Sequence, residues 1–218
     1  LQFLREKAVE KNLIDVAQQI LDDMLQQIAS LENEIEKEEL VTPLVKVLAF
    51  EDNLELALSI CQQYCVRSIP FLWYSHAYKL FKNGEISQAE AAIQKGMSIV
   101  EEYRDNPIKV DNGYGWKQIY PTLKKTSMDY LTMIFVHTNQ VERALQIRNE
   151  HDTGEMAEIA ITAALFLKGK QKQAYQLIAQ SAQHGQESAI TYTAVELADQ
   201  GHPDLAVEAL QPLLPIED

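Results

Sequence analysis

One pattern recurs six times along the chain, and it constrains the fold more than any other feature. An apolar residue is followed four positions later by Asn, Asp or Gly, and five positions after that by Ala. The instances are Ala8-Asn12-Ala17, Leu48-Asp52-Ala57, Leu80-Gly84-Ala89, Phe135-Asn139-Ala144, Leu165-Gly169-Ala174 and Leu197-Gly201-Ala206. Asn, Asp and Gly best tolerate a left-handed backbone, so each can end a helix and reverse the chain. The pattern therefore predicts six helix–turn–helix units.

The residues one helical turn outward from each predicted turn are mostly apolar. Four residues before the apolar residue that begins the pattern stand Leu4, Leu44, His76, Leu131, Ile161 and Thr193. Four residues after the Ala that ends it stand Leu21, Cys61, Ile93, Arg148, Ile178 and Leu210. Each unit is thus two short amphipathic helices that cannot bury their apolar faces alone, whereas stacked units share one core. Arg148 stands where an apolar residue is expected and weakens the prediction of a second helix in the fourth unit.

We therefore expect an all-α fold, a solenoid of about six antiparallel helix pairs forming an α-α superhelix in one domain over residues 1–218. The units lie near residues 1–30, 38–66, 70–104, 125–150, 155–184 and 187–218. The charged stretch before the second unit is interpreted as the solvated face of lengthened helices.

The third unit resembles the tetratricopeptide repeat (TPR). Its consensus positions are occupied by Trp73, Ala77, Leu80, Ala89 and Ile93, with His76 where Leu is usual. The fifth and sixth units fit moderately, and the first and second carry Arg5 and Val45 where a small residue is expected. The resemblance implies that a partner lies along the concave surface made by the first helix of each pair.

When the groove positions of the tetratricopeptide repeat are transferred to this sequence, they form an apolar and aromatic stripe. In the third unit it contains Phe71, Tyr74, Tyr78 and Phe81, and in the following units Met133, Val136, Met156, Ile159 and Phe166. Such a surface suits an apolar peptide or an amphipathic helix. The same stripe is equally compatible with core packing between repeats, or with a surface covered by an insertion.

One variant of the resembled family clamps a carboxylate with Lys and Asn at two groove positions. Here the corresponding pairs are Thr42/Lys46, Tyr74/Tyr78, Asp129/Met133, Ile159/Ala163 and Thr191/Val195, which do not make that clamp. The formal net charge of −13 also favours an apolar or mildly basic peptide as the partner.

An insertion at residues 105–124 separates the third and fourth units. Pro107 and Pro121 bracket an Asp111-Asn112-Gly113 turn, which predicts a hairpin between 108–110 and 114–116. Its aromatic and cationic side chains are candidates for binding, because long loops often carry function. These candidates are Tyr114, Trp116, Lys117 and Tyr120. The alternative is an insertion that packs back over the solenoid.

Charge and composition restrict which classes of partner and which cellular compartment we expect. An acidic chain repels phosphate backbones and anionic lipid, so we expect neither nucleic acid nor a membrane as partner. No apolar run approaches the roughly 18 residues that a membrane span needs. Two cysteines favour a reducing compartment, and we expect a cytoplasmic protein, although Leu1 opens the chain and a targeting sequence upstream would not be seen.

Residue patterns for catalysis, metal or cofactor binding are missing from the sequence. Cys61 and Cys65 lie four apart and Cys61 falls on a core position, the five histidines are dispersed, and His76 is interpreted as a hydrogen-bonded interior residue. There is no phosphate loop or nucleophile elbow. We therefore expect a protein- or peptide-binding scaffold or adaptor that is not an enzyme and needs no cofactor. The alternatives are a regulatory or ligand-sensing module of a longer signalling protein and an enzyme built on a helical toroid; the oligomeric state is open.

Overall fold

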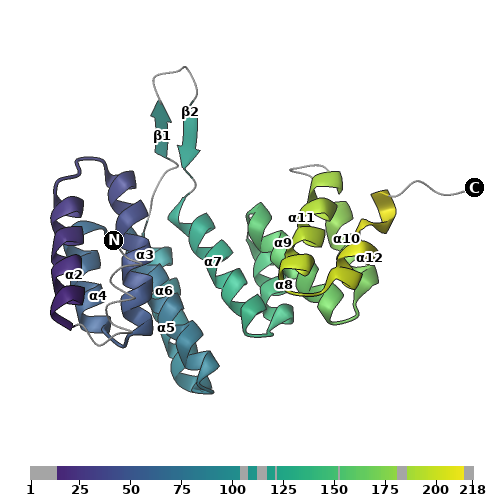
Figure 1. Ribbon diagram of the computed structural model, residues 1–218, viewed down its shortest axis with the longest axis horizontal. Coiled ribbons are helices and arrows are strands. Elements are labelled where there is room, and N and C mark those ends of the chain that lie inside the picture. Colours follow the sequence, from purple (N-terminus) through teal and green to yellow (C-terminus); the bar gives the residue numbers. More distant parts are fainter. Residues whose placement is uncertain are drawn as a thin grey trace, which may run out of the picture. The chain divides into compact units, whose positions relative to one another are not determined.

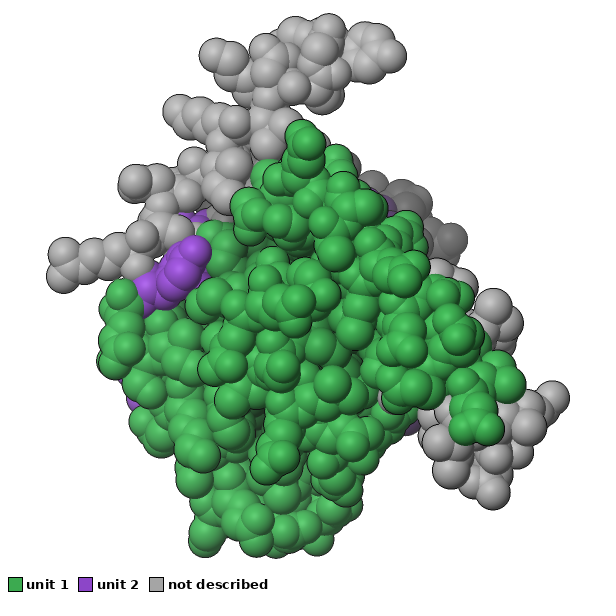
Figure 2. All heavy atoms as spheres, turned by 90° about the vertical axis from the view of Figure 1, so that its left-hand side faces the viewer, with its two compact units in different colours: residues 1–102 green, residues 103–218 purple. Residues whose placement is uncertain are grey.

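The computed structural model describes residues 14–103, 108–111, 117–120, 122–151, 153–180 and 186–213. Within them lie eleven α-helices, two short 3-10 segments and one β-hairpin (Figure 1). The predicted helical class is confirmed. The chain divides into two compact units, residues 1–102 and 103–218 (Figure 2), which are described one at a time.

The described part of unit 1 consists of five helices around one apolar core. They are α2 (Ile14–Ala29), α3 (Glu34–Phe50), α4 (Leu54–Tyr64), α5 (Ile69–Lys82) and α6 (Ile86–Glu102), with the 3-10 turn η1 (Val66–Ser68) before α5. Helix α3 packs on α4 and α5 packs on α6, while the two first helices α3 and α5 also pack on each other. Leu44, Leu48 and Leu72 are fully buried in the shared core.

Unit 2 repeats the arrangement after a hairpin. Its elements are β1 (Ile108–Asp111), β2 (Lys117–Tyr120), α7 (Leu123–His137), α8 (Val141–Glu150), α9 (Glu155–Leu167), α10 (Gln171–Gln180), α11 (Gln186–Asp199), α12 (Pro203–Leu210) and the 3-10 turn η2 (Gln211–Leu213). The pairs are α7–α8, α9–α10 and α11–α12, and the first helices α7, α9 and α11 pack in succession. This succession is the packing that stacked helix pairs require.

The predicted turn residues adopt the left-handed backbone on which the sequence argument depends. Five of the six lie in the described part of the chain, with φ of 63° at Asp52, 80° at Gly84, 62° at Asn139, 68° at Gly169 and 85° at Gly201. The sixth, Asn12, lies outside the described residues. The turn positions are therefore confirmed wherever the structure describes them.

Backbone hydrogen bonds explain why the pattern has a fixed spacing. Around Gly84, the N–H of Glu85 donates to the carbonyl of Leu80 (2.9 Å) and the N–H of Gly84 donates to Phe81 (3.1 Å). The carbonyl of Glu85 then accepts from Ala89 (3.0 Å), the first bond of the next helix. One residue thus closes a Schellman motif and also begins the following helix.

The alanines occupy the contact between the paired helices. Their exposed fractions are 0% for Ala57, Ala89, Ala144 and Ala174, and 7% for Ala206. The side chain of Ala17 lies outside the described residues. Their burial agrees with the close packing of paired helices that the repeat pattern predicts.

The hairpin of unit 2 differs in register from the one predicted. Strand β1 begins at Ile108 as expected, but its partner runs from Lys117 to Tyr120, with Ile108 opposite Tyr120 and Asp111 opposite Lys117. Asp111, which the prediction placed in the turn, is itself paired in β1. The predicted second strand at 114–116 lies outside the described residues.

The charged stretch at the start of α3 is mostly exposed, but Lys37 and Glu38 are half-buried. Glu38 on α3 is half-buried and forms a 2.6 Å salt bridge with Arg67 of η1, which is itself buried. This carboxylate links α3 to the segment that leads into α5, so the interpretation as a purely solvated face is wrong at Glu38.

Candidate functional site

Two of the predicted groove residues in unit 1 belong to the core. Phe71 is 6% exposed and Tyr74 is fully buried. A Cβ placed on Gly96 of α6 would lie 2.4 Å from Cε1 of the Tyr74 ring, so the ring lies flush against the helix backbone. Helix α5 packs on α3, α4 and α6, and this packing uses the apolar residues that the sequence argument had divided between core and groove. The groove assignment is therefore wrong for Phe71 and Tyr74.

Tyr78 and Phe81 keep partial exposure at the end of α5. The Tyr78 ring meets Phe50 of α3 edge to face, with centroids 5.7 Å apart, and Lys82 Nζ lies 5.6 Å from the Tyr78 centroid. Phe50 is 42% exposed. These rings form an aromatic surface where the two first helices of unit 1 end.

The two positions of a carboxylate clamp in the second repeat serve packing between α3 and α5. The hydroxyls of Thr42 and Ser68 share a 2.8 Å hydrogen bond. Lys46 Nζ lies 5.4 Å from the centroid of the Phe71 ring. Burial lowers the pKa of Lys46 to about 8, because the charged ammonium loses hydration there.

Replacing this half-buried lysine should stabilise the fold below pH 8. Because the pKa of Lys46 is lower in the folded state, the penalty for its charge is fully present below pH 8 and is lost as the pH rises toward the unfolded value of 10.5. We expect Lys46→Met to raise the free energy of unfolding by about 1–2 kcal/mol at neutral pH, allowing for partial exposure. Urea unfolding of both proteins from neutral to pH 10 measures it, and a difference that does not shrink with pH contradicts this origin.

The predicted groove residues of unit 2 are also divided. Phe166 is 1% exposed and meets Tyr175 of α10 edge to face at 5.2 Å, so the assignment to a groove is wrong for Phe166. Ile159 is 5% exposed, Met133 is half-buried, and Met156 at the start of α9 is 64% exposed. Met156 is the predicted groove residue most accessible to a partner.

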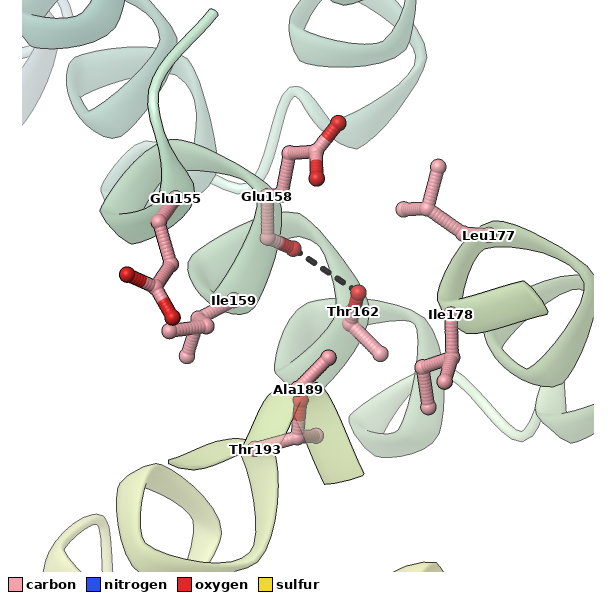
Figure 3. A pocket seen from close by; sticks show the side chains of 8 residues that line it. All are labelled: Glu155, Glu158, Ile159, Thr162, Leu177, Ile178, Ala189 and Thr193. Carbon is pink, nitrogen blue, oxygen red and sulfur yellow. Dashed lines mark hydrogen bonds between the residues drawn. The ribbon is translucent and has the colours of Figure 1, made fainter. Parts of the chain in front are cut away.

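A pocket opens among α9, α10 and α11, and Ile159 is one of its walls (Figure 3). It is shallow: its enclosed volume is about 10 Å³, about the room of one water molecule. The lining residues are Glu155, Glu158, Ile159, Thr162, Leu177, Ile178, Ala189 and Thr193. Figure 3 shows Glu155 and Ile159 on one side, Leu177 and Ile178 on the other, and the α11 residues below them.

The polar atoms of the pocket are unevenly satisfied. Thr162 Oγ1 donates to the backbone carbonyl of Glu158 at 2.8 Å, as the dashed line in Figure 3 marks. Thr193 is 1% exposed and its hydroxyl has no hydrogen-bond partner. A buried hydroxyl without a partner is unfavourable unless a bound group supplies one.

Arg148 borders this region and explains how α8 forms with an arginine at an apolar position. Its Nε lies 3.2 Å from Glu158 Oε1, and its Nη1 donates to Gln180 Oε1 at 3.3 Å. One guanidinium thus connects α8 to both helices of the next pair. The doubt that the sequence raised about this helix is removed, because charge pairing replaces apolar contact.

The start of α9, which carries Glu155 and Met156, is held by α7. The backbone N–H of Gly154, the N-cap of α9, donates to the Asp129 carboxylate. A carboxylate at a helix N-terminus satisfies an exposed N–H and complements the helix dipole. A Cβ at Gly154 would lie 2.6 Å from Asp129 Oδ2, so the carboxylate would have to move away from the helix end. The first turn of α9 is therefore fixed in position.

The insertion candidates lie mostly beyond what the structure describes. Tyr114 and Trp116 are outside the described residues, while Lys117 and Tyr120 are the first and last residues of β2. Only their backbone pairing is defined. Their role in binding stays a prediction.

Other residues considered from the sequence have structural positions. Cys61 and Cys65 are buried, which confirms Cys61 as a core residue. His76 is half-buried and its Nδ1 has no hydrogen-bond partner, so the interpretation as a hydrogen-bonded interior histidine is wrong at Nδ1. Among the described residues, no three His, Cys, Asp or Glu side chains are grouped to hold a metal.

None of the described helices combines the length and hydropathy needed to cross a bilayer. No model of a known protein family matches the sequence, and no curated protein matches it.

Proposed function

We propose that the chain is a scaffold that binds another protein or a peptide along the first helices of its helix pairs. The observation that carries this proposal is the pocket among α9, α10 and α11. Two exposed apolar residues adjoin its lining in the sequence: Met156 follows Glu155, and Tyr192 precedes Thr193. Exposed apolar side chains on the helices that form a pocket are typical anchors for a bound peptide.

The stacked helix pairs support the same proposal. Helices α7, α9 and α11 pack side by side, and a row of such helices offers an extended surface for a chain to lie on. The resemblance of the third unit to the tetratricopeptide repeat leads to the same role, with the superhelix as its expected framework. The net charge of −13 favours a basic partner over an acidic one.

Selection from a peptide display library on the immobilised full chain tests the proposal. We expect enriched peptides that combine apolar and basic residues. The double variant Met156→Ser, Tyr192→Ser should weaken their binding about tenfold or more, because truncated anchors lose at least about 1.4 kcal/mol. Both side chains are more than half exposed (64% and 52%), so the fold should be unaffected.

Val207→Ser is the matched control for this experiment. Val207 is 59% exposed on α12, the second helix of its pair, and is not part of the pocket lining. Affinity should be unchanged in this variant. A library that enriches no peptide, or a control variant that weakens binding as much as the double variant does, contradicts the proposal.

A further inference from the structure

Helix α11 has a buried side and an apolar exposed side. The buried side carries Ala189, Thr193 and Leu197, spaced four residues apart, and the first two lie in the wall of the pocket shared with α9 (Figure 3). On the exposed side, Tyr192 is 52% and Val195 is 51% exposed. Residues three apart in a helix are neighbours on its surface, so these two apolar side chains share one exposed face.

The preceding first helix shows how the same positions are used when a neighbouring helix covers them. Ala160 and Ala163 of α9 correspond to Tyr192 and Val195 of α11, because they stand the same five and two residues before the apolar residue that begins the repeat pattern. Both alanines are buried, at 3% and 0% exposed, and α9 packs on both α7 and α11. In stacked repeats a helix face that meets only water is polar. Larger apolar side chains at these positions of α11 therefore indicate a surface that a partner covers.

The charges on and around this face are all acidic. No lysine or arginine occurs anywhere from residue 173 to residue 218. Glu196 follows Tyr192 by four residues and Asp199 follows Val195 by four, so their carboxylates continue the exposed face along α11. Glu196 accepts a hydrogen bond from the Gln200 amide at 2.6 Å, which leaves its charge in place. An occupant of complementary chemistry would therefore be apolar on the side that meets Tyr192 and Val195, and cationic beside it.

We propose that this face of α11 binds a basic amphipathic helix of the partner. The apolar side of that helix would pack on Tyr192 and Val195, and its lysine or arginine side chains would reach Glu196 and Asp199. These four residues have the spacing i, i+3, i+4 and i+7, through which one helix packs along another. An extended strand gains its affinity from backbone hydrogen bonds to a sheet edge, and a helix face does not offer them.

Charge also favours this occupant over a second copy of the chain. A two-fold interface would place the same acidic face opposite itself, and each copy carries a net charge of −13. The inference rests on the proposed function and deepens it, since it states the conformation and the charge of the segment that is bound.

Nuclear magnetic resonance of the isotope-labelled full chain tests the inference with peptides as probes. The first probe is a peptide of leucine and lysine, about four helical turns or ~14 residues long, with its leucines at the helical period. The second replaces each lysine by glutamate, and the third rearranges the first so that the helical period is lost. We expect the first probe to shift amide signals of α11 and to bind more weakly as salt is added, and the other two to bind at least about tenfold more weakly. Equal binding of either of the other two probes overturns the inference, as does the absence of α11 shifts at millimolar concentrations of the first probe.

The apolar half of the contact is tested by the double variant Tyr192→Ser, Val195→Ser. Binding of the leucine–lysine peptide should weaken about tenfold or more, because both apolar anchors are removed. The circular dichroism spectrum should be unchanged, since both side chains are half exposed. Unchanged binding overturns the inference.

The acidic half is tested by the double variant Glu196→Gln, Asp199→Asn. Binding should weaken about threefold or more and depend less on salt. The matched control is Glu102→Gln, Glu150→Gln, which removes the same net charge from exposed positions on α6 and α8. Binding should be unchanged in the control. An equal loss in both double variants means that the whole chain attracts the peptide without a site on α11, and this overturns the inference.

Further outcomes separate this inference from its alternatives. If sedimentation shows a dimer that Tyr192→Ser, Val195→Ser converts to a monomer, the occupant is a second copy and the inference is overturned. If display-selected peptides bind through Met156 and Tyr192 but are indifferent to Glu196→Gln, Asp199→Asn, the basic helix is wrong and peptide binding stands. If the display library enriches no peptide and the leucine–lysine peptide does not bind, both the inference and the proposed function fail.

Discussion

Tyr74→Ala is expected to lower the free energy of unfolding of unit 1 by about 3–5 kcal/mol, the range found when a buried aromatic residue is truncated. Tyr74 is fully buried, and its ring lies against the backbone of α6 at Gly96. The variant therefore leaves a cavity between α5 and α6. Urea unfolding monitored by circular dichroism measures the loss, and hydrogen exchange should localise it to the amides of these two helices.

Tyr74→Phe is the control for this experiment. The Tyr74 hydroxyl is buried without a hydrogen-bond partner, and burial raises the pKa of the phenol. Removing the oxygen should leave stability unchanged or raise it by up to about 1 kcal/mol. Tyr78→Ala should be mild by comparison, because the Tyr78 ring is half-exposed. If Tyr74→Ala leaves stability intact, then Tyr74 belongs to an open surface after all.

The turns were predictable from sequence because their cause is local. Asp52 and Gly169 adopt a positive φ because of their own residue types, a short polar side chain in one and no Cβ in the other. The nine-residue spacing from the apolar residue to the alanine follows from hydrogen bonds within a single turn. The same local rules place both ends of the helices around each turn. No tertiary contact has to be known for that part of the prediction.

The division of α5 into core and surface was not predictable in this way. Its sequence is apolar on two faces, and the sequence does not indicate which neighbours cover them. Tyr74 is buried because α6 offers a glycine at the contact, while Tyr78, one turn later, meets the partly exposed Phe50. Contacts of this kind depend on the register between helices, which the repeat pattern alone does not define.

The site in unit 2 had partial signals in the sequence. Arg148 and Thr193 are polar residues at positions that are apolar in most repeats, and each contributes to the region around the pocket. The repeat pattern identifies Arg148 as a departure from the expected apolar residue, and it assigns no function to either residue. Their proximity to α9 and α10 depends on the stacking of successive pairs, so the pocket itself could be found only from the structure.

Gly96→Ala tests the contact from the opposite helix and should lower the free energy of unfolding by about 2–3 kcal/mol. This direction is the reverse of what helix propensity predicts, since alanine is favoured over glycine within a helix by about 1 kcal/mol. The added methyl group would lie 2.4 Å from Cε1 of the Tyr74 ring, which is too close for an unstrained contact. The ring cannot simply move outward, because it is fully buried.

A double-mutant cycle assigns that loss to the ring. In the Tyr74→Ala background, Gly96→Ala should be neutral or stabilising, because the cavity accommodates the methyl group and the propensity gain remains. Ser98→Ala, at an exposed position of the same helix, should change stability by less than about 0.5 kcal/mol. If Gly96→Ala is as damaging without the Tyr74 ring as with it, the glycine is required for another reason and the close packing of α5 on α6 is not its cause.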